Sequence, residues 1–147
     1  ILTVAGILHD IGGYISNRSH HKHSKYLIAN SDVFGLGTEE LQLAALVARY
    51  HRRAEPKDTH ADYVALRRRK KLTVIKLSAV LRVADALDRS HDQRLGNVDF
   101  RLQPGRLVIC SSYRGSTAVE RVALEEKGQM FKTVFGREPV LRPAKAE

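Results

Sequence analysis

Apolar residues recur at every third or fourth position through most of residues 1–95, which is the spacing of one buried face on a helix. Glycine, proline and short polar runs interrupt the pattern and mark the helix ends. The helices predicted in this way end near residue 11 and then cover about 20–30, 39–52, 61–70 and 73–90. This part of the chain therefore predicts a mainly α fold with one helical core.

The pattern changes after Gly96, where apolar and polar residues begin to alternate as they do in strands. Pro104 and Gly105 mark a turn between two such strands. The predicted elements are, in order, strands at 98–102 and 107–111, a helix at about 118–135 and a strand at 139–142. We therefore expect a helical domain at 1–95, followed by a small β-β-α-β subdomain at 96–147.

Residue types that bind metals stand at the edges of the apolar helix faces. His9 and Asp10 lie in the last turn of the first predicted helix. His51 ends the third, and Asp85 lies at the edge of the apolar stripe of the last. Imidazole and carboxylate together suit divalent ions such as Mn, Fe, Zn or Mg. One shared polar site is the favoured interpretation, and an ion pair with a neighbouring arginine is the open alternative for Asp85.

The chain carries a formal net charge of +9, and the basic residues are clustered. The blocks are His20-His21-Lys22-His23, Arg49 with Arg52 and Arg53, and Arg67-Arg68-Arg69-Lys70-Lys71. Such clusters raise the local concentration of polyanions. The amides at the start of the second helix, beside the histidine block, would also favour an anion. The open alternative for these blocks is a solvated helix face or helix end.

In combination, these blocks resemble the HD superfamily of metal-dependent phosphohydrolases, whose metal ligands are His, His-Asp and a late Asp. The closer resemblance is to the C-terminal HD-like domain of the exopolyphosphatase/guanosine pentaphosphate phosphohydrolase (Ppx/GppA) family. It rests on the residue blocks 8–12, 20–28, 30–32, 47–53 and 81–91. The resemblance runs from residue 1 to about residue 95, and the remainder fits the family's small C-terminal extension in pattern only.

The resemblance implies an HD-type helical fold and a divalent metal, Mg, Mn or similar. HD domains usually take a further metal-binding His from a helix upstream of the His-Asp pair. That helix and the family's actin-like N-terminal domains are not part of this sequence, so we expect an N-terminally truncated piece of a larger enzyme. The residues expected to be catalytic are His9, Asp10 and Asp85. Those expected to bind metal are His9, Asp10, His23, His51 and Asp85. Those expected to bind phosphate are His20, His21, Lys22, Arg49, Arg52, Arg53, Arg67, Arg68 and Arg69.

The expected function is that of the C-terminal HD-like portion of a phosphoanhydride phosphohydrolase of exopolyphosphatase or guanosine pentaphosphatase type. It would bind polyphosphate or guanosine pentaphosphate and contribute to a homodimer, while being incomplete as an enzyme by itself. Two alternatives stay open: a self-contained metal-dependent HD phosphohydrolase acting on a nucleotide or phosphodiester, and a non-catalytic basic polyanion-binding regulatory module. Nucleic acid is a less favoured partner, because no helix-turn-helix or zinc-finger spacing is present.

No stretch approaches the roughly 18 consecutive apolar residues of a membrane helix. The apolar start lacks the basic leader and cleavage site of a signal peptide. The single Cys110 excludes an internal disulfide framework. A cytoplasmic protein with no membrane partner is expected.

Overall fold

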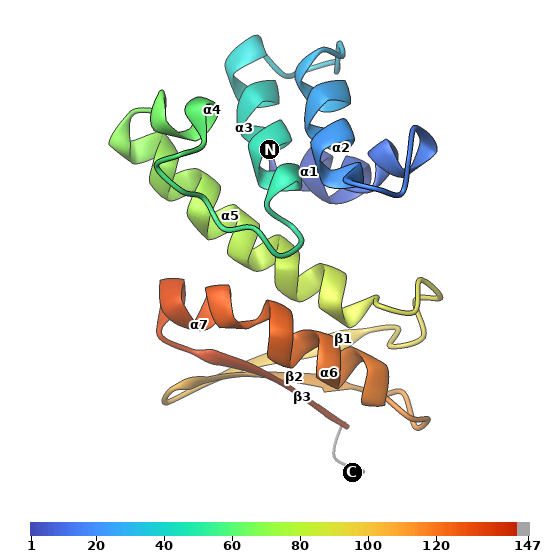
Figure 1. Ribbon diagram of the computed structural model, residues 1–147. Coiled ribbons are helices and arrows are strands. Elements are labelled where there is room, and N and C mark those ends of the chain that lie inside the picture. Colours follow the sequence, from blue (N-terminus) through green and yellow to red (C-terminus); the bar gives the residue numbers. More distant parts are fainter. Residues whose placement is uncertain (144–147) are drawn as a thin grey trace. The chain divides into compact units, whose positions relative to one another are not determined.

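The computed structural model describes residues 1–143 and confirms a mainly α fold with a small sheet (Figure 1). The chain divides into two compact units, Ile1–Leu81 (unit 1) and Arg82–Glu147 (unit 2). The division falls inside the long helix α5, Arg68–Leu87. The domain boundary near residue 95 stays a prediction, and residues 144–147 of the expected second domain lie outside the described part.

Unit 1 consists of helices that follow the predicted order. They are α1 (Leu2–Leu8), the 3-10 turn η1 (Ile11–Tyr14), α2 (His20–Ala29), α3 (Thr38–Arg49), α4 (Ala61–Val64) and the first part of α5. Helix α3 packs against both α1 and α2. The fully buried Ala44, Ala45 and Ala48 lie in this contact, and their small side chains let the helices approach closely. The resulting core also contains Ala5 of α1 and Ile28 of α2.

A second cluster in unit 1 joins α3 to α4 and α5. Tyr50, at the end of α3, packs with Tyr63 of α4 and Val74 of α5, and all three side chains are buried. The single helix predicted for 61–70 is wrong in this respect, since α4 is one turn long and α5 begins separately at Arg68. The two tyrosines let this short turn bury apolar surface that it could not bury alone.

Gly12 explains how η1 reaches the start of α2. Its N–H donates a hydrogen bond of 2.9 Å to the buried Oγ of Ser24. A Cβ at Gly12 would overlap the carbonyl oxygen of His20 and the amide nitrogen of Ser24, and it would lie 2.8 Å from the Cβ of His23. Only glycine permits this approach, which holds the end of α1 close to the start of α2.

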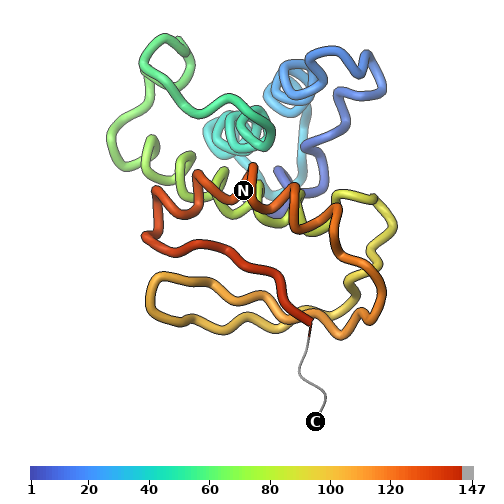
Figure 2. Tube along the Cα trace, turned by 60° about the horizontal axis from the view of Figure 1, so that its bottom comes forward, coloured from blue at the N-terminus to red at the C-terminus, as the bar shows by residue number. Residues whose placement is uncertain are grey.

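Unit 2 holds the predicted β-β-α-β arrangement. Its strands are β1 (Val98–Gln103), β2 (Arg106–Ser111) and β3 (Glu138–Pro143), in that spatial order, and its helices are α6 (Ala118–Lys127) and α7 (Gln129–Phe135). The hairpin β1–β2 is antiparallel, whereas β2 and β3 are parallel and joined through the helices (Figures 1 and 2). The core contains Val83 and Ala86 from the end of α5, Ile109, Leu124 and Leu141.

The helix predicted for 118–135 is interrupted at Gly128, which separates α6 from α7. A Cβ at Gly128 would lie 2.5 Å from the carbonyl oxygen of Leu124 and 2.6 Å from the Cγ of Pro139. The break therefore lets β3 pass directly beneath the helix pair. Among the described residues, no helix is both long and apolar enough to cross a membrane.

Candidate metal centre and phosphate-binding surface

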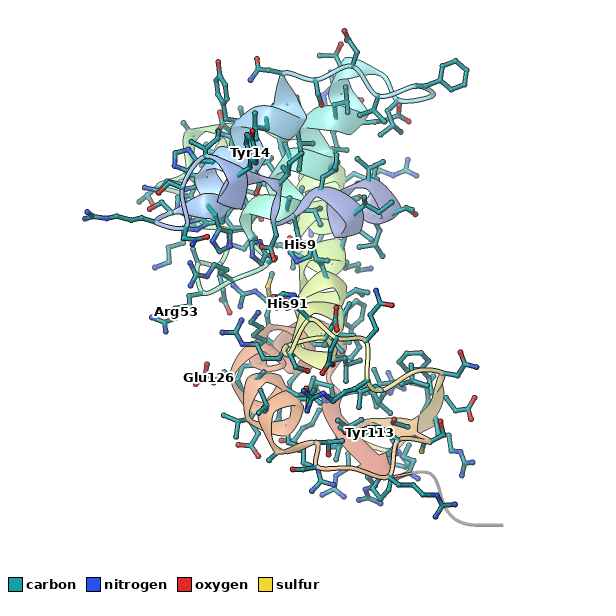
Figure 3. All side chains as sticks on the ribbon, turned by 90° about the vertical axis from the view of Figure 1, so that its right-hand side faces the viewer. His9, Tyr14, Arg53, His91, Tyr113 and Glu126 are labelled. Carbon is teal, nitrogen blue, oxygen red and sulfur yellow. The ribbon has the colours of Figure 1, made fainter. Side chains whose placement is uncertain are left out.

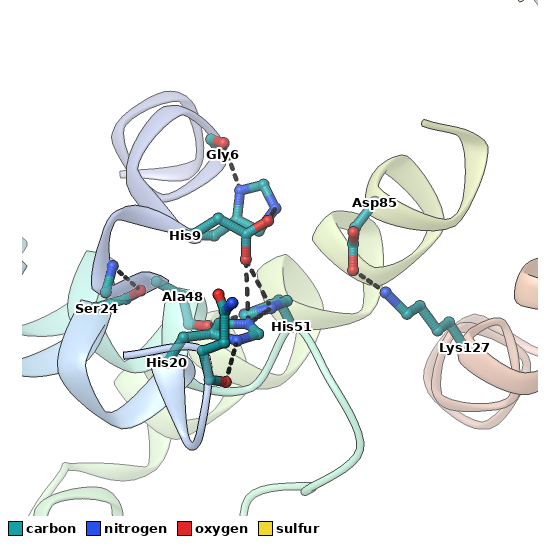
Figure 4. A network of polar contacts seen from close by, with 11 residues as sticks. Gly6, His9, His20, Ser24, Ala48, His51, Asp85 and Lys127 are labelled. Atoms are coloured by element: carbon teal, nitrogen blue, oxygen red, sulfur yellow. Dashed lines mark hydrogen bonds and ion pairs between the residues drawn. The ribbon is translucent and has the colours of Figure 1, made fainter. Parts of the chain in front are cut away.

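Three histidines from separate segments of unit 1 converge on one carboxylate. His9 follows α1, His20 begins α2 and His51 follows α3 (Figure 4). Nε2 of His20 lies 3.2 Å, and Nε2 of His51 lies 3.4 Å, from Oδ1 of Asp10. Nε2 of His9 lies 3.4 Å from the other carboxylate oxygen. The fold thus brings the adjacent pair His9 and Asp10 together with His20 and His51, which are distant in sequence, to form one polar centre.

The backbone fixes the ring orientation of each histidine. The Nδ1 atom of His9 lies 2.7 Å from the carbonyl oxygen of Gly6, and that of His51 lies 2.6 Å from the carbonyl oxygen of Ala48. The Nδ1 atom of His20 lies 3.3 Å from the carbonyl oxygen of Asn17. Because a carbonyl oxygen only accepts, each Nδ1 donates to it, and this contact turns each Nε2 towards Asp10. An imidazole whose other nitrogen donates to a backbone carbonyl is the usual form of a metal-binding histidine.

Two ring nitrogens face each other in this centre. Nε2 of His20 lies 3.3 Å from Nε2 of His51. When both rings carry their proton on Nδ1, these two atoms are both acceptors, and a proton or a metal ion between them would relieve their repulsion. His9, Asp10 and His51 each offer one ligand atom, and these atoms all lie within 4.8 Å of one another. The nitrogen and oxygen donors fit a divalent ion such as Mn, Fe, Zn or Mg, so the donor set suits the metal that the sequence predicts.

The charge states agree with this chemistry. The hydrogen bond with His51 holds the pKa of Asp10 well below its ordinary value, and the neighbouring histidines lower it further when they are protonated. Burial lowers the pKa of His20 below the ordinary value of a histidine. At neutral pH, therefore, the carboxylate is ionised and His20 is neutral, and these are the forms that bind a metal ion. His20, which the sequence assigns to phosphate binding, lies beside this group, with its Nε2 atom 3.2 Å from Asp10, although the group of close ligand atoms does not include it.

Two further residues, His23 and Asp85, are predicted from the sequence to bind metal. Among the described residues, the group of close ligand atoms includes neither His23 nor Asp85. Asp85 belongs to unit 2, where its buried carboxylate pairs with Lys127 of α6 (Figure 4). The sequence did not identify Lys127 as a partner, because it lies 42 residues away along the chain. The catalytic and metal-binding roles of Asp85 and the metal-binding role of His23 stay predictions.

Two arginines act electrostatically on the histidines at the start of α2. Burial, and then the positive charge of Arg49, lower the pKa of His21 to about 4. The charge of Arg52 is a smaller contribution that lowers the pKa of both His20 and His21. These positive charges would attract an anion that approaches the polar centre. His21 is neutral at pH 7 and can contribute a hydrogen bond but no charge.

A stack of rings holds the segment that carries the arginines. The Oη of Tyr50 lies 2.9 Å from Nδ1 of His60, and the two rings are stacked at 5.5 Å. The guanidinium of Arg49 lies over the ring of Tyr50 at 5.7 Å. His60 therefore ties the end of the loop that contains Arg52 back to the buried end of α3. No local motif distinguishes His60 in the sequence.

The remaining predicted phosphate-binding residues are more exposed. Arg53 extends into solvent (Figure 3), and Lys22 is also exposed. Within the basic run at 67–71, Lys70 pairs with Glu39 of α3, and Lys71 lies over the ring of Tyr63 at 5.4 Å. The three exposed arginines of the run are Arg67, Arg68 and Arg69. Their phosphate-binding role stays a prediction.

Comparison with known proteins supplies the family context. The family described as Ppx/GppA phosphatase, domain III, matches residues 1–127. A curated relative, the guanosine-5'-triphosphate,3'-diphosphate pyrophosphatase of Pseudoalteromonas translucida (strain TAC 125), is 36% identical over 52 residues. That match covers 35% of this chain and 10% of the relative, so the chain corresponds to a small part of that protein.

Proposed function

Because the chain belongs to the Ppx/GppA phosphatase family, whose domain III it matches over residues 1–127, we propose that it binds phosphate chains for a larger phosphohydrolase. The larger protein would be an exopolyphosphatase or a guanosine pentaphosphatase that hydrolyses phosphoanhydrides, and it would work as a homodimer. One observation carries the proposal: the Nε2 atoms of three histidines converge on Asp10 beside Arg49 and Arg52.

The metal centre would comprise His9, Asp10 and His51, with His20 as a fourth ligand. A bound divalent ion would offset the negative charge of phosphate oxygens. The backbone carbonyls on Nδ1 orient the imidazoles before the ion arrives, so that little side-chain ordering opposes binding. These contacts support a site that binds metal without large rearrangement.

Arginine provides the second part of the proposed surface. Guanidinium groups bind phosphate through two parallel hydrogen bonds, which favours Arg49 and Arg52 as the phosphate contacts nearest to the metal centre. Arg53, Lys22 and the exposed arginines at 67–69 would extend attraction to a longer chain. Polyphosphate is therefore the preferred probe, since its repeating charge can engage several such groups at once.

Metal binding can be measured by titrating Mn²⁺ into the 147-residue chain in a calorimeter. Asp10→Asn and His20→Gln should each weaken Mn²⁺ binding at least about tenfold, because each removes one donor of the cluster. His91→Asn is the matched control, since His91 is exposed in unit 2 and should leave Mn²⁺ affinity unchanged. Equal affinity of all three variants and the parent chain would refute the metal centre.

Phosphate binding needs a separate measurement, the affinity for long polyphosphate across a salt series with and without Mn²⁺. Arg52→Gln should weaken binding and flatten the slope of log affinity against log salt by roughly 0.7 for each phosphate that the arginine neutralises in the parent chain. Arg114→Gln, at an exposed position of unit 2, removes the same charge as a control. If the two variants behave alike, or if double-stranded DNA binds as tightly as polyphosphate, the surface attracts polyanions generally and the proposal fails.

A second candidate is a self-contained metal-dependent phosphohydrolase acting on a nucleotide or phosphodiester, which the histidine–aspartate cluster favours. It predicts that this chain with Mn²⁺ hydrolyses bis(p-nitrophenyl) phosphate, and that Asp10→Asn abolishes the activity. Metal and polyphosphate binding without any such hydrolysis would exclude this candidate while leaving the first proposal intact.

A further inference from the structure

The strand β1 forms an outer edge of the sheet in unit 2 (Figure 2). Its hairpin with β2 closes through the two-residue turn Pro104-Gly105, where Gly105 adopts a φ of +68°. The two residues that flank a two-residue turn direct their backbone N–H and C=O groups towards each other. Every second residue along each strand then points its backbone groups in the same direction. Gln103 and Arg106 are this closing pair. The backbone N–H and C=O groups of Val98, Phe100 and Leu102 therefore point away from β2, at the free edge.

The other edge of the sheet is protected against pairing, whereas β1 is not. The N–H of Glu138 donates to the carbonyl oxygen of Gly105, so the backbone groups of Pro139, Leu141 and Pro143 point outward from β3. Two of these three residues are prolines, which have no N–H to donate, and proline is a common means of preventing strand addition at an edge. The sequence of β1 contains no proline.

The side chains of β1 also suit an added strand. Phe100 is 59% exposed and Leu102 is 70% exposed. They lie on the sheet face of Ile109 and Leu107, their partners in β2, and so extend an apolar face beyond the part that is buried. Asp99 and Arg101, which are both exposed, project from the opposite face, because side chains alternate along a strand.

This strand is complementary to a second copy of itself. When two copies run antiparallel with Phe100 opposite Phe100, Val98 lies opposite Leu102, and Asp99 lies opposite Arg101. Because the contact is two-fold symmetric, the apolar pair of Val98 with Leu102 and the charged pair of Asp99 with Arg101 each occur twice. The same register places the three outward-facing residues of one copy opposite those of the other, so that all their N–H and C=O groups can pair. Other registers lose either the opposite charges or the backbone pairing.

We propose that two copies of this chain associate through their β1 edges in that register, forming one sheet with three strands from each copy. The proposal deepens the homodimer of the proposed function by naming its surface. Such a two-fold contact uses the same patch of both copies. The partner is a second copy of the chain, because the sequence Asp-Phe-Arg places opposite charges against each other when it pairs antiparallel with itself.

Charge variants test the register, with sedimentation velocity of the 147-residue chain over a concentration series as the measurement. Asp99→Arg and Arg101→Asp should each shift the chain towards monomer, raising the dimer dissociation constant about tenfold or more. The double variant Asp99→Arg/Arg101→Asp should restore the parent value. An equimolar mixture of the two single variants should form a heterodimer, because all four facing charges are then opposite. Circular dichroism verifies that these exposed substitutions leave the fold intact.

A backbone variant tests the edge itself. Phe100→Pro removes an outward N–H and leaves the hydrogen bonds to β2 in place, so it should produce a folded monomer. A dimer that survives both this variant and the charge variants would overturn the β1 contact while leaving a homodimer intact. A parent chain that stays monomeric at every concentration would overturn both. Neither outcome alters the Mn²⁺ and polyphosphate measurements, which use unit 1.

Discussion

Replacing Gly12 with alanine should separate the two halves of the proposed metal centre, because this glycine holds η1 against the start of α2. The added Cβ would meet backbone atoms of His20 and Ser24, which cannot yield as a flexible side chain can. Relief requires α2 to move away from η1, and that movement strains the hydrogen bond from the Gly12 N–H to the buried Oγ of Ser24. The same movement carries His20 away from Asp10.

The magnitude follows from these two contributions. Overpacking a tight contact costs about 1–3 kcal/mol, and leaving a buried donor without its acceptor costs about 1–3 kcal/mol. A partial movement of α2 relieves the overpacking but weakens the hydrogen bond of the buried donor. We therefore expect Gly12→Ala to lower the free energy of unfolding by about 2–4 kcal/mol. The midpoint of thermal unfolding should fall by roughly 5–15 °C. Mn²⁺ affinity should fall about tenfold or more.

Gly13→Ala is the matched control for this measurement. A Cβ at Gly13 would meet only the Oδ1 of Asn17, at the ordinary contact distance of 3.6 Å. It should leave stability unchanged or raise it by up to about 1 kcal/mol through the unfolded chain. Urea denaturation and Mn²⁺ calorimetry of both variants provide the comparison. If Gly12→Ala unfolds within about 0.5 kcal/mol of Gly13→Ala and binds Mn²⁺ equally well, Gly12 does not hold η1 against α2.

Two further predictions concern charged groups. The folded-state pKa of Asp10 lies below its unfolded value, so ionised Asp10 stabilises the fold above about pH 4, and this contribution is lost as pH falls through the folded pKa. In urea denaturation, the stability advantage of the parent chain over Asp10→Asn should shrink as pH falls below about 4; an advantage that is the same at pH 3 as at pH 5 contradicts the pKa shift. Lys127→Met should destabilise the chain by about 3 kcal/mol, because it removes an ion-pair partner of Asp85, whose side chain is only 4% exposed. Adding Asp85→Asn should recover at least half of that loss, and no recovery would show that Lys127 acts through packing alone.

The sequence by itself determined the fold class, the family and the main elements of unit 1. Helical periodicity is a local signal, and the apolar stripes that it marked became the buried faces of α3 and α5. Residue type and position predict the His9-Asp10 pair and His51 as metal ligands. The structure places them together, since α1 and α3 pack directly against each other. The alternation of β1 and β2 was equally readable, because each strand carries its own period of two.

Only the tertiary structure decided which polar residues meet. His20 lies at a helix start that could face solvent, and it became a neighbour of Asp10 because Gly12 brings η1 against α2. The contact of Tyr50 with His60 and that of Asp85 with Lys127 also join residues that no local pattern connects. The break at Gly128 follows from the passage of Pro139 beneath it, so it too depends on a distant strand. Local periodicity predicts which side of an element is buried, but the identity of its partner is set by packing between elements far apart in the chain.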